Sequence, residues 1–199
     1  MSISLKANSD GSAEILNGVI SALKINTDGS LEGTTIDGKL DKSENIVLGT
    51  SVAASGTAVD FVGIPEGVKR ITVMFDGVST NGTNSPVLRI GSGNIESTNY
   101  LSFYVGFNAT GGGGRDSPNG FILRGTTQAT WALNGQVILT KDSLNTFLAV
   151  GGFRFDSSGT GSFVSGSKSL FAPLDRIRIT TVNGTDQFDA GTINIAWEF

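Results

Sequence analysis

The feature that most restricts the fold of this chain is an alternation of apolar and polar residues at every second position, which recurs in short segments. The clearest cases are VKRITVMFDGV at 68–78, where Ile71, Val73 and Phe75 fall on one side, and TINIAWEF at 192–199. A period of two places alternate side chains on opposite faces of a strand, so each segment predicts a β-strand with one buried face. Other short apolar segments predict further strands at residues 101–107, 119–125, 130–140, 144–155 and 175–182.

Dipeptides that favour tight turns stand beside or within these segments. Asp76-Gly77 closes the first segment, Asn134-Gly135 separates two apolar runs, and Asn183-Gly184 follows residue 182. Asn-Gly and Asp-Gly tolerate the positive φ angles of two-residue hairpin loops, so Asn134-Gly135 predicts a hairpin. Gly151-Gly152 predicts a break between two short strands. The final segment ends in alternating apolar residues, and we expect it to be paired within a sheet.

The composition favours strands and turns over helices. The chain has 28 glycines and 12 phenylalanines, and no long stretch rich in Ala, Leu, Glu and Lys. Only GKLDKSEN at 38–45 could form a turn of helix. From about residue 50 onward, we expect about eight to ten short strands. The sequence therefore predicts an all-β fold, with an extended N-terminal segment followed by a β-sandwich or jelly-roll domain.

The residue types that are missing exclude several kinds of chemistry. The chain contains no cysteine and no histidine, which excludes disulfides, thiolate zinc sites, histidine metal ligands and histidine-dependent nucleophilic catalysis. The net charge of −4, with scattered Lys and Arg, gives no basic patch for nucleic acid. No apolar run reaches 18 residues, and no secretory signal is recognised. We expect no cofactor, no metal, no nucleic-acid partner and no membrane insertion.

A nine-residue phrase is repeated near the start of the chain. KANSDGSAE at 6–14 and KINTDGSLE at 24–32 share six of nine residues at an offset of 18. The phrase superficially resembles a calcium loop, but Glu14 follows Gly11 by three residues where that loop needs six. A β-turn at each Asp-Gly is the favoured reading. The apolar residues on the flanking strands are then expected to form an attachment or oligomer interface: Ile15, Leu16, Leu23, Ile25 and Leu31.

Residues 1–48 contain no aromatic side chain and therefore differ in composition from residues 49–199, which contain all of the Phe, Tyr and Trp residues. A segment with so few large apolar groups cannot build much core alone, so it must lie along another surface or pair with copies of itself. We therefore expect two parts: an attachment or shaft segment at 1–48 that holds the internal repeat, and a β-sandwich head at 49–199.

The glycine run GGGGRDSPNG at 111–120 is the second candidate site. It lacks the Gly-Lys-Ser/Thr ending of a phosphate-binding loop, and apolar strands are expected on both sides of it. A connecting loop is the simplest interpretation. The functional alternative is an exposed loop that touches a partner through Arg115, Asp116 and Asn119.

Pairs of carboxylates could also indicate a sugar hydrolase. Most of the acidic residues stand beside Gly, Ser, Pro or Asn, as turn residues do, and no pair is singled out. Trp131 and Trp197 could stack on sugar rings, although a tryptophan in a strand more often belongs to the core. No catalytic residue is predicted. The acidic residues considered are Asp60, Glu66, Asp76, Asp116, Asp142, Asp156, Asp175, Asp186, Asp189 and Glu198.

Several phrases resemble proteins of tailed-bacteriophage fibres and appendages. Residues 49–100, above all SGTAVDFVGIPEGVKRITVMFDGVSTNGT at 55–83, look like the opening of a β-rich domain of that family, and GTINIAWEF at 191–199 is similar to its ending. LKINTDGSLEG at 23–33 resembles a phrase of fibre shafts. The resemblance implies a homotrimeric virion protein, of the head-fibre or tail-fibre type, anchored to another virion protein through residues 1–48. The head would then adhere to a glycan or protein of the host surface, from a location on the virion surface. A capsid decoration protein and a small polysaccharide-degrading enzyme stay open as alternatives.

Overall fold

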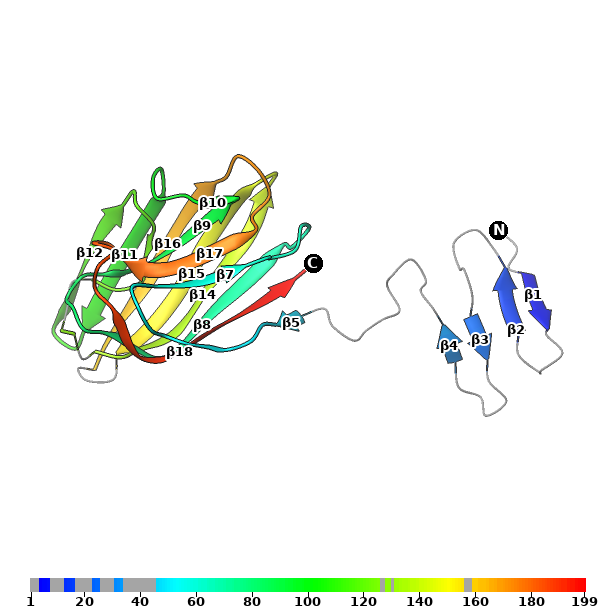
Figure 1. Ribbon diagram of the computed structural model, residues 1–199, viewed down its shortest axis with the longest axis horizontal. Coiled ribbons are helices and arrows are strands. Elements are labelled where there is room, and N and C mark those ends of the chain that lie inside the picture. The colour runs from blue at the N-terminus through cyan, green and yellow to red at the C-terminus, as the bar shows by residue number, and fades with distance from the viewer. Residues whose placement is uncertain are drawn as a thin grey trace. The chain divides into compact units, whose positions relative to one another are not determined.

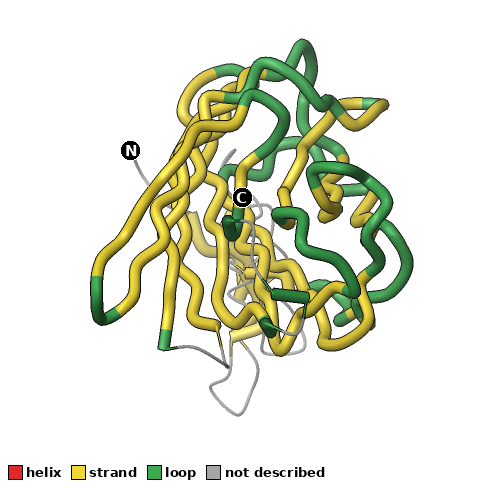
Figure 2. The backbone as a smooth tube through the Cα atoms, turned by 90° about the vertical axis from the view of Figure 1, so that its left-hand side faces the viewer, coloured by secondary structure: helices red, strands yellow, loops and turns green. Residues whose placement is uncertain are grey.

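The computed structural model describes residues 46–125, 128–129, 131–155 and 159–199, and the backbone of four short strands before them. Strands and loops make up all of this described part, and no helix occurs in it (Figure 2). The expected all-β class is therefore confirmed. The possible helical turn at 38–45 lies outside the described residues.

The chain divides into two compact units, at 1–45 and 46–199. The first unit contains two antiparallel hairpins of similar design. In the first hairpin Lys6 pairs with Glu14, and in the second Lys24 pairs with Glu32, so the repeated phrase produces the same register twice. The turn residues lie outside the described part, but the expected strands flank them: β1 (Ser4–Ala7), β2 (Ala13–Leu16), β3 (Leu23–Ile25) and β4 (Leu31–Gly33).

The second unit is a sandwich of two antiparallel sheets, and the larger sheet holds nine of the described strands (Figure 1). In spatial order these are β12 (Gly111–Ser117), β11 (Leu101–Asn108), β16 (Thr160–Ser169), β15 (Thr146–Phe155), β14 (Leu133–Ser143), β8 (Arg70–Thr80), β18 (Phe188–Glu198) and β5 (Ile46–Leu48), with β6 (Val52–Ala53) also on β18.

The smaller sheet has five described strands and covers the middle of the larger one. Its spatial order is β10 (Asn94–Ile95), β9 (Pro86–Ser92), β17 (Arg176–Thr181) and β7 (Ala58–Val62), with β13 (Phe121–Ile122) also on β9. Alternate residues of both sheets point inward and form one apolar core, as period two requires. The expected core residues Ile71, Val73 and Phe75 are all buried.

Two of the predicted turns are wrong, and the structure shows why. Asp76-Gly77 lies inside β8, and Asn134-Gly135 lies inside β14. These strands are neighbours, and the pairing shifts register between Leu133 and Gly135, as in a β-bulge. The Gly77 N–H donates to Oδ1 of Asn134 at 2.9 Å, and Gly77 has φ of 64°. The conformational freedom that suggested turns is used to bend two adjacent strands.

The predicted break at Gly151-Gly152 is also wrong, because β15 runs unbroken through it. A Cβ on Gly151 would lie 2.5 Å from the carbonyl oxygen of Gln136 on β14. The glycine is there because the neighbouring backbone approaches closely. The actual β14–β15 turn is centred near Leu144, which has φ of 38°.

Other expectations about the head are confirmed. The last strand, β18, pairs with β8 on one side and with β5 and β6 on the other, so it lies within the sheet. Asn183-Gly184 forms a turn that carries the chain from one sheet to the other. Residues 46–48 form β5, which pairs with β18 within the second unit.

Candidate functional site

One part of the outer face of the large sheet is apolar and exposed. It is formed by β11, β15 and β16, whose register places their outward residues in adjacent rows. Leu101 is 75% exposed and Phe163 is 58% exposed. We call this surface the apolar face, and it comprises Leu101, Phe103, Phe107, Leu148, Val150 and Phe163. Contiguous exposed apolar patches of more than a few hundred Å² are seldom found on monomeric proteins and are typical of sites of association.

Glycines on the same face leave space in which its aromatic rings pack against the backbone of neighbouring strands. A Cβ on Gly114 would lie 2.6 Å from the ring of Phe103, and a Cβ on Gly161 would lie 2.8 Å from the ring of Phe107. Gly152 stands in the same relation to Phe163 at 3.2 Å. The rings therefore lie down over neighbouring strands, and the face is broad and shallow.

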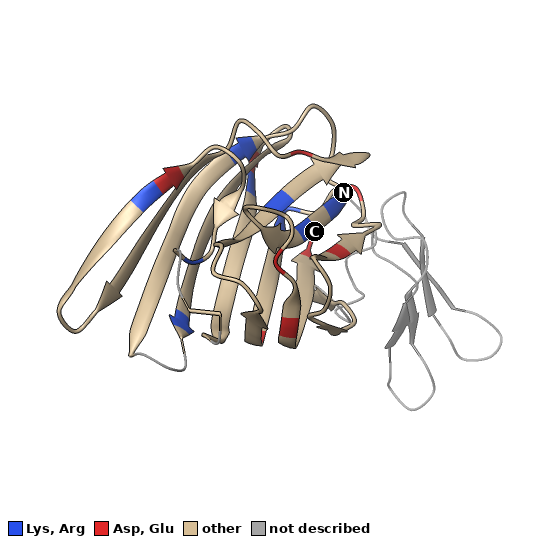
Figure 3. Cartoon of the chain, turned by 60° about the vertical axis from the view of Figure 1, so that its left-hand side comes forward, with Lys and Arg blue, Asp and Glu red and all other residues tan. Residues whose placement is uncertain are grey.

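The apolar face carries no charge in its centre. Residues 101–107, 147–152 and 161–167 contain no Asp, Glu, Lys or Arg. Figure 3 shows charged residues only sparsely along the long strands of the large sheet. Charges stand directly beside the apolar face: Asp116 pairs with Phe103 at the β12 edge, and the exposed Arg154 of β15 pairs with Gly161, next to Phe107. A neutral surface of this type can meet an identical surface without like-charge repulsion.

A second feature lies at the inner side of the same end of the sheet. It is an open groove of about 410 Å³, which we call the aromatic groove. Tyr104, Phe107, Trp131 and Phe155 supply its aromatic lining, and Phe107 is shared with the apolar face. Gly106 and Gly113 lie on paired positions of β11 and β12 within it. The Trp131 and Phe155 rings are stacked, with centroids 6.1 Å apart. Its polar lining residues include Asn108, Thr110 and Thr160, and no acidic residue is among the described lining residues.

Arg124 lies behind the walls of this groove. Its side chain is 1% exposed, and its Nη1 donates to the carbonyl of Trp131. Nε and Nη2 have no hydrogen-bond partner among the described residues. Burial lowers the pKa of Arg124 to about 10, and the proximity of Tyr104 acts weakly in the opposite direction. A buried donor without a partner is costly, so an unpaired guanidinium here needs an explanation.

The predicted partner-binding residues Arg115, Asp116 and Asn119 are all exposed, but the expected loop at 111–120 is wrong. Residues 111–117 form β12, which pairs with β11 along its whole length. Arg115 faces Tyr104 in this register and donates to Oγ of Ser85, whereas Asp116 points to the other face. The structure therefore separates these two residues.

Asn119 belongs to the turn after β12. Its N–H donates to Oγ of Ser117 at 3.2 Å, and its carbonyl accepts from Nε of Arg89 at 2.7 Å. Within the glycine run, Gly114 leaves the space that the ring of Phe103 on β11 occupies. Binding of a partner by the three predicted residues stays a prediction.

The predicted interface residues of the first unit lie on its strands. Ile15 and Leu16 belong to β2, Leu23 and Ile25 to β3, and Leu31 to β4. Their side chains lie outside the described part, so their role as an interface stays a prediction.

Several of the acidic residues considered as catalytic candidates have structural partners. Asp60 binds Arg178 with oxygen–nitrogen distances of 2.6 and 2.7 Å. Asp175 binds Arg176, and that hydrogen bond holds the pKa of Asp175 below its usual value. An acid catalyst in a glycosidase needs a raised pKa, which is the opposite shift.

Asp186 ties two loops together in a similar way. Oδ1 accepts from Nδ2 of Asn183 at 2.6 Å, and Oδ2 accepts from the N–H of Asn84 at 2.9 Å. These hydrogen bonds lower the pKa of Asp186, with Asn183 contributing most. Gly82 lies directly against the carboxylate, where a Cβ would come within 2.0 Å. Asp186 therefore holds the β8–β9 connection against the β17–β18 connection.

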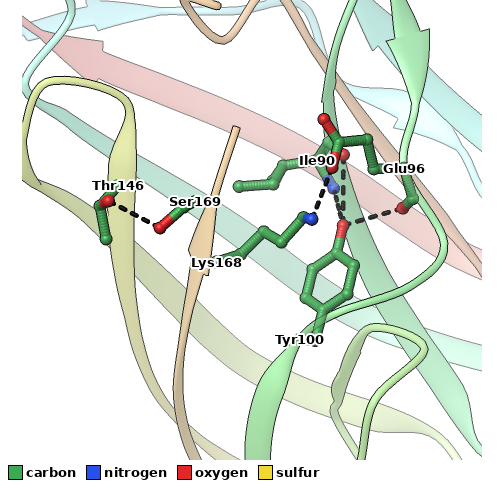
Figure 4. A network of polar contacts seen from close by, with 6 residues as sticks. All are labelled: Ile90, Glu96, Tyr100, Thr146, Lys168 and Ser169. Carbon is green, nitrogen blue, oxygen red and sulfur yellow. Dashed lines mark hydrogen bonds and ion pairs between the residues drawn. The ribbon is translucent and has the colours of Figure 1, made fainter. Parts of the chain in front are cut away.

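A buried polar network joins the two sheets (Figure 4). Nζ of Lys168 on β16 lies 2.5 Å from Oε2 of Glu96 and 5.2 Å from the centre of the Tyr100 ring. The Tyr100 hydroxyl accepts from the N–H of Ile90 at 2.8 Å and lies 2.9 Å from the Glu96 carbonyl. Burial raises the pKa of Tyr100 well above its usual value. The network positions the segment that leads into β11 and the apolar face.

The described residues contain no group of three or more acidic, histidine or cysteine side chains that could hold a metal ion. They also contain no helix of the length and hydropathy that crosses a membrane.

The sequence predicted strands at the positions of β11 and β15, but it predicted neither β16 nor the apolar face that the three strands form. In LSFYVGF at 101–107 the apolar residues Leu101, Phe103, Val105 and Phe107 alternate, a pattern that by itself favours a buried side. The structure instead exposes Leu101, Phe103 and Phe107 and buries Ser102. No protein family, curated protein or solved structure matches the chain.

Proposed function

We propose that this chain is a structural protein of a tailed-bacteriophage virion, a short surface fibre that assembles from three copies and is anchored through residues 1–48. The observation that carries the assembly is the apolar face. The attribution to a virion is supported by the resemblance of residues 23–33, 49–100 and 191–199 to fibre and appendage proteins. The head would be the exposed part and would adhere to the host surface.

Copies of this chain are the occupant that best fits the apolar face. Each chain has a net charge of −4, so copies repel one another unless they meet through an uncharged surface. The apolar face supplies such a surface. Covering its half-exposed side chains would contribute roughly 1 kcal/mol each, since complete burial of a large apolar side chain contributes about 1.5–3 kcal/mol.

The two hairpins of the first unit suit an anchoring role. A two-stranded hairpin is marginally stable alone, and two strands of three or four residues offer little surface for a core. Contacts with other copies, or with another virion protein, would stabilise them. Repetition of one hairpin design adds equivalent contacts along such an assembly.

Imaging of the particle tests this proposal. A gold-binding tag at the C-terminus, on phage particles from the genome that encodes the chain, should appear on the outside of the virion. A second tag at the N-terminus should lie nearer the particle wall. Density on the capsid would identify a head fibre or decoration protein, and density on the tail a tail fibre. Particles that lack the label, although the tagged protein is made, would contradict the proposal.

A further inference from the structure

We propose that the aromatic groove, with Arg115 beside it and Arg124 behind it, binds a carboxylate-bearing sugar. This inference deepens the adhesion role proposed above, and it rests on that proposal for the source of the ligand. The chemistry of the groove can be tested by itself.

The walls of the groove fit a sugar ring. Tyr104 and Trp131 give flat apolar surfaces with a polar group at one end, which is how aromatic side chains bind amphipathic ligands. The stacked Phe155 supports the Trp131 ring from within the core. Asn108 and Thr110 line the same opening and bring hydrogen-bonding groups. An open site of about 410 Å³ with a few polar groups has the size of small-ligand sites in general.

The glycines keep the groove open. Gly106 and Gly113 are paired across β11 and β12, and Gly113 has no heavy atom within 4 Å of the position of a Cβ. The Tyr104 hydroxyl lies in a slot where a Cβ on Gly106 would come within 2.2 Å and a Cβ on Gly125 within 2.5 Å. The Tyr104 ring is therefore fixed between backbone segments and presents one prepared surface.

Two arginines stand close to the groove, neither of them among its described lining residues, and they favour an acid as the ligand. Arg115 stands opposite Tyr104 on β12, is exposed, and has only the hydroxyl of Ser85 as a partner among the described residues. A guanidinium can bind a carboxylate through two parallel hydrogen bonds. Arg124 contacts the backbone of Trp131 and keeps two nitrogens unpaired in a buried position. The described lining residues of the groove include no acidic side chain, so none of them would repel an incoming carboxylate.

Arg124 is a positioning residue in this account, because it acts through Trp131 and Tyr104 from behind the groove. A buried cation without a counter-ion is unfavourable in the free protein, and an anion in the groove reduces that penalty. Arg115 is the residue expected to touch the carboxylate.

The experiment uses the full chain and two pairs of probes. Tetragalacturonate and its methyl ester have the same rings and differ in charge, and sialyllactose and lactose differ by one acidic sugar. Binding is followed by calorimetry and by the tryptophan fluorescence of Trp131. We expect at least one acid to bind saturably and its neutral counterpart to bind at least tenfold more weakly. Higher salt concentration should weaken the binding of the acidic probe and leave the binding of its neutral counterpart unchanged.

Four variants assign the residues. Trp131→Leu and Arg115→Gln should each weaken binding of the acid about tenfold or more. Trp197→Phe, which alters the other tryptophan, should leave binding unchanged. Arg124→Met should weaken binding of the acid while leaving the unfolding midpoint equal or higher, because it removes an unpaired buried charge. If Arg124 serves only to stabilise the fold, the unfolding midpoint of Arg124→Met should fall instead, and that result would contradict the positioning role.

Three results would overturn the inference. They are no saturable binding of either acid, equal binding of acid and neutral counterpart, or unchanged binding by Trp131→Leu that has kept its fold. None of these results affects the particle-imaging test, so failure of the groove and failure of the proposed function can be told apart.

Discussion

Phe163 on β16 stacks on Phe107 of β11, with ring centroids 5.4 Å apart and planes at 24°, and both rings face solvent. A stacked aromatic pair in water exposes apolar surface that another molecule can cover. This pair stands at one end of the apolar face, beyond the rows of Leu101 and Phe103, and it gives the first prediction.

Phe163→Ser should weaken self-association and leave the fold intact. The ring is 58% exposed, so its loss should change the free energy of unfolding by less than about 1 kcal/mol. Sedimentation velocity over a range of concentrations should show the assembly dissociating at higher concentration than for the original chain. Phe171→Ser is the matched control, because Phe171 is 99% exposed and lies outside the apolar face. Equal effects of both substitutions would contradict the assignment of the interface.

The Lys168–Glu96 pair gives an asymmetric prediction. Lys168 is 4% exposed, whereas Glu96 is at the edge of the network and partly solvated. Glu96→Gln leaves a buried cation without a counter-ion, while Lys168→Met leaves a carboxylate that water can reach. Glu96→Gln should therefore destabilise the fold more than Lys168→Met does. Urea unfolding of both variants and the double variant should give a coupling of about 0.5–3 kcal/mol. The reverse order of the single variants would contradict burial of this charge.

Asp186 predicts a loss of stability in acid. Its pKa is lowered in the folded chain by Asn183 and Asn84, so the unfolded state binds more protons as the pH falls. The stabilisation is fully present above the unfolded pKa of about 4 and is lost as the pH falls through the folded pKa. Asp186→Asn should therefore unfold at a lower temperature than the original chain at pH 7, and the difference should shrink near pH 3. A constant difference across that range would show that the charge is not responsible.

A substitution at Gly151 tests whether this position lies in a strand, as in the structure, or in a break between strands, as the sequence suggested. Gly151→Ala should destabilise the fold by about 1–3 kcal/mol, because the new methyl group meets the Gln136 carbonyl and Val137. Gly113→Ala is the control on β12, where a Cβ meets nothing within 4 Å, and it should change stability by less than about 0.5 kcal/mol. Thermal unfolding measures both. A tolerated Gly151→Ala would contradict the continuous strand β15.

Many of the strands could be read from the sequence because period two is a local property, but β9, β12 and β16 were not predicted. Ile71, Val73 and Phe75 alternate within a few residues, and the core requires that alternation wherever the sheet lies. The positions of the turns could be predicted less well from the sequence. The same dipeptide, Asn-Gly, forms a turn at residues 183–184 and lies within a strand at 134–135, because the second case serves a bulge shared with β8. Only the neighbouring strand decides between these outcomes.

The candidate sites depend on which strands become neighbours, and sequence alone could not supply that. Arg115 and Asp116 are adjacent in the chain, yet their side chains leave β12 on opposite faces, one toward Tyr104 and the other opposite Phe103. Trp131 was noted as a possible sugar-stacking residue, but its stacking on Phe155 and its contact with Arg124 join segments without a local pattern. The apolar face likewise needs β11, β15 and β16 side by side.

Sedimentation equilibrium of the intact chain tests the central claim most directly. The account predicts a single species with three times the chain mass of 20.6 kDa at micromolar concentration, and a shift toward 20.6 kDa for Phe163→Ser. A species of 20.6 kDa at micromolar concentration for the original chain would contradict assembly through the apolar face.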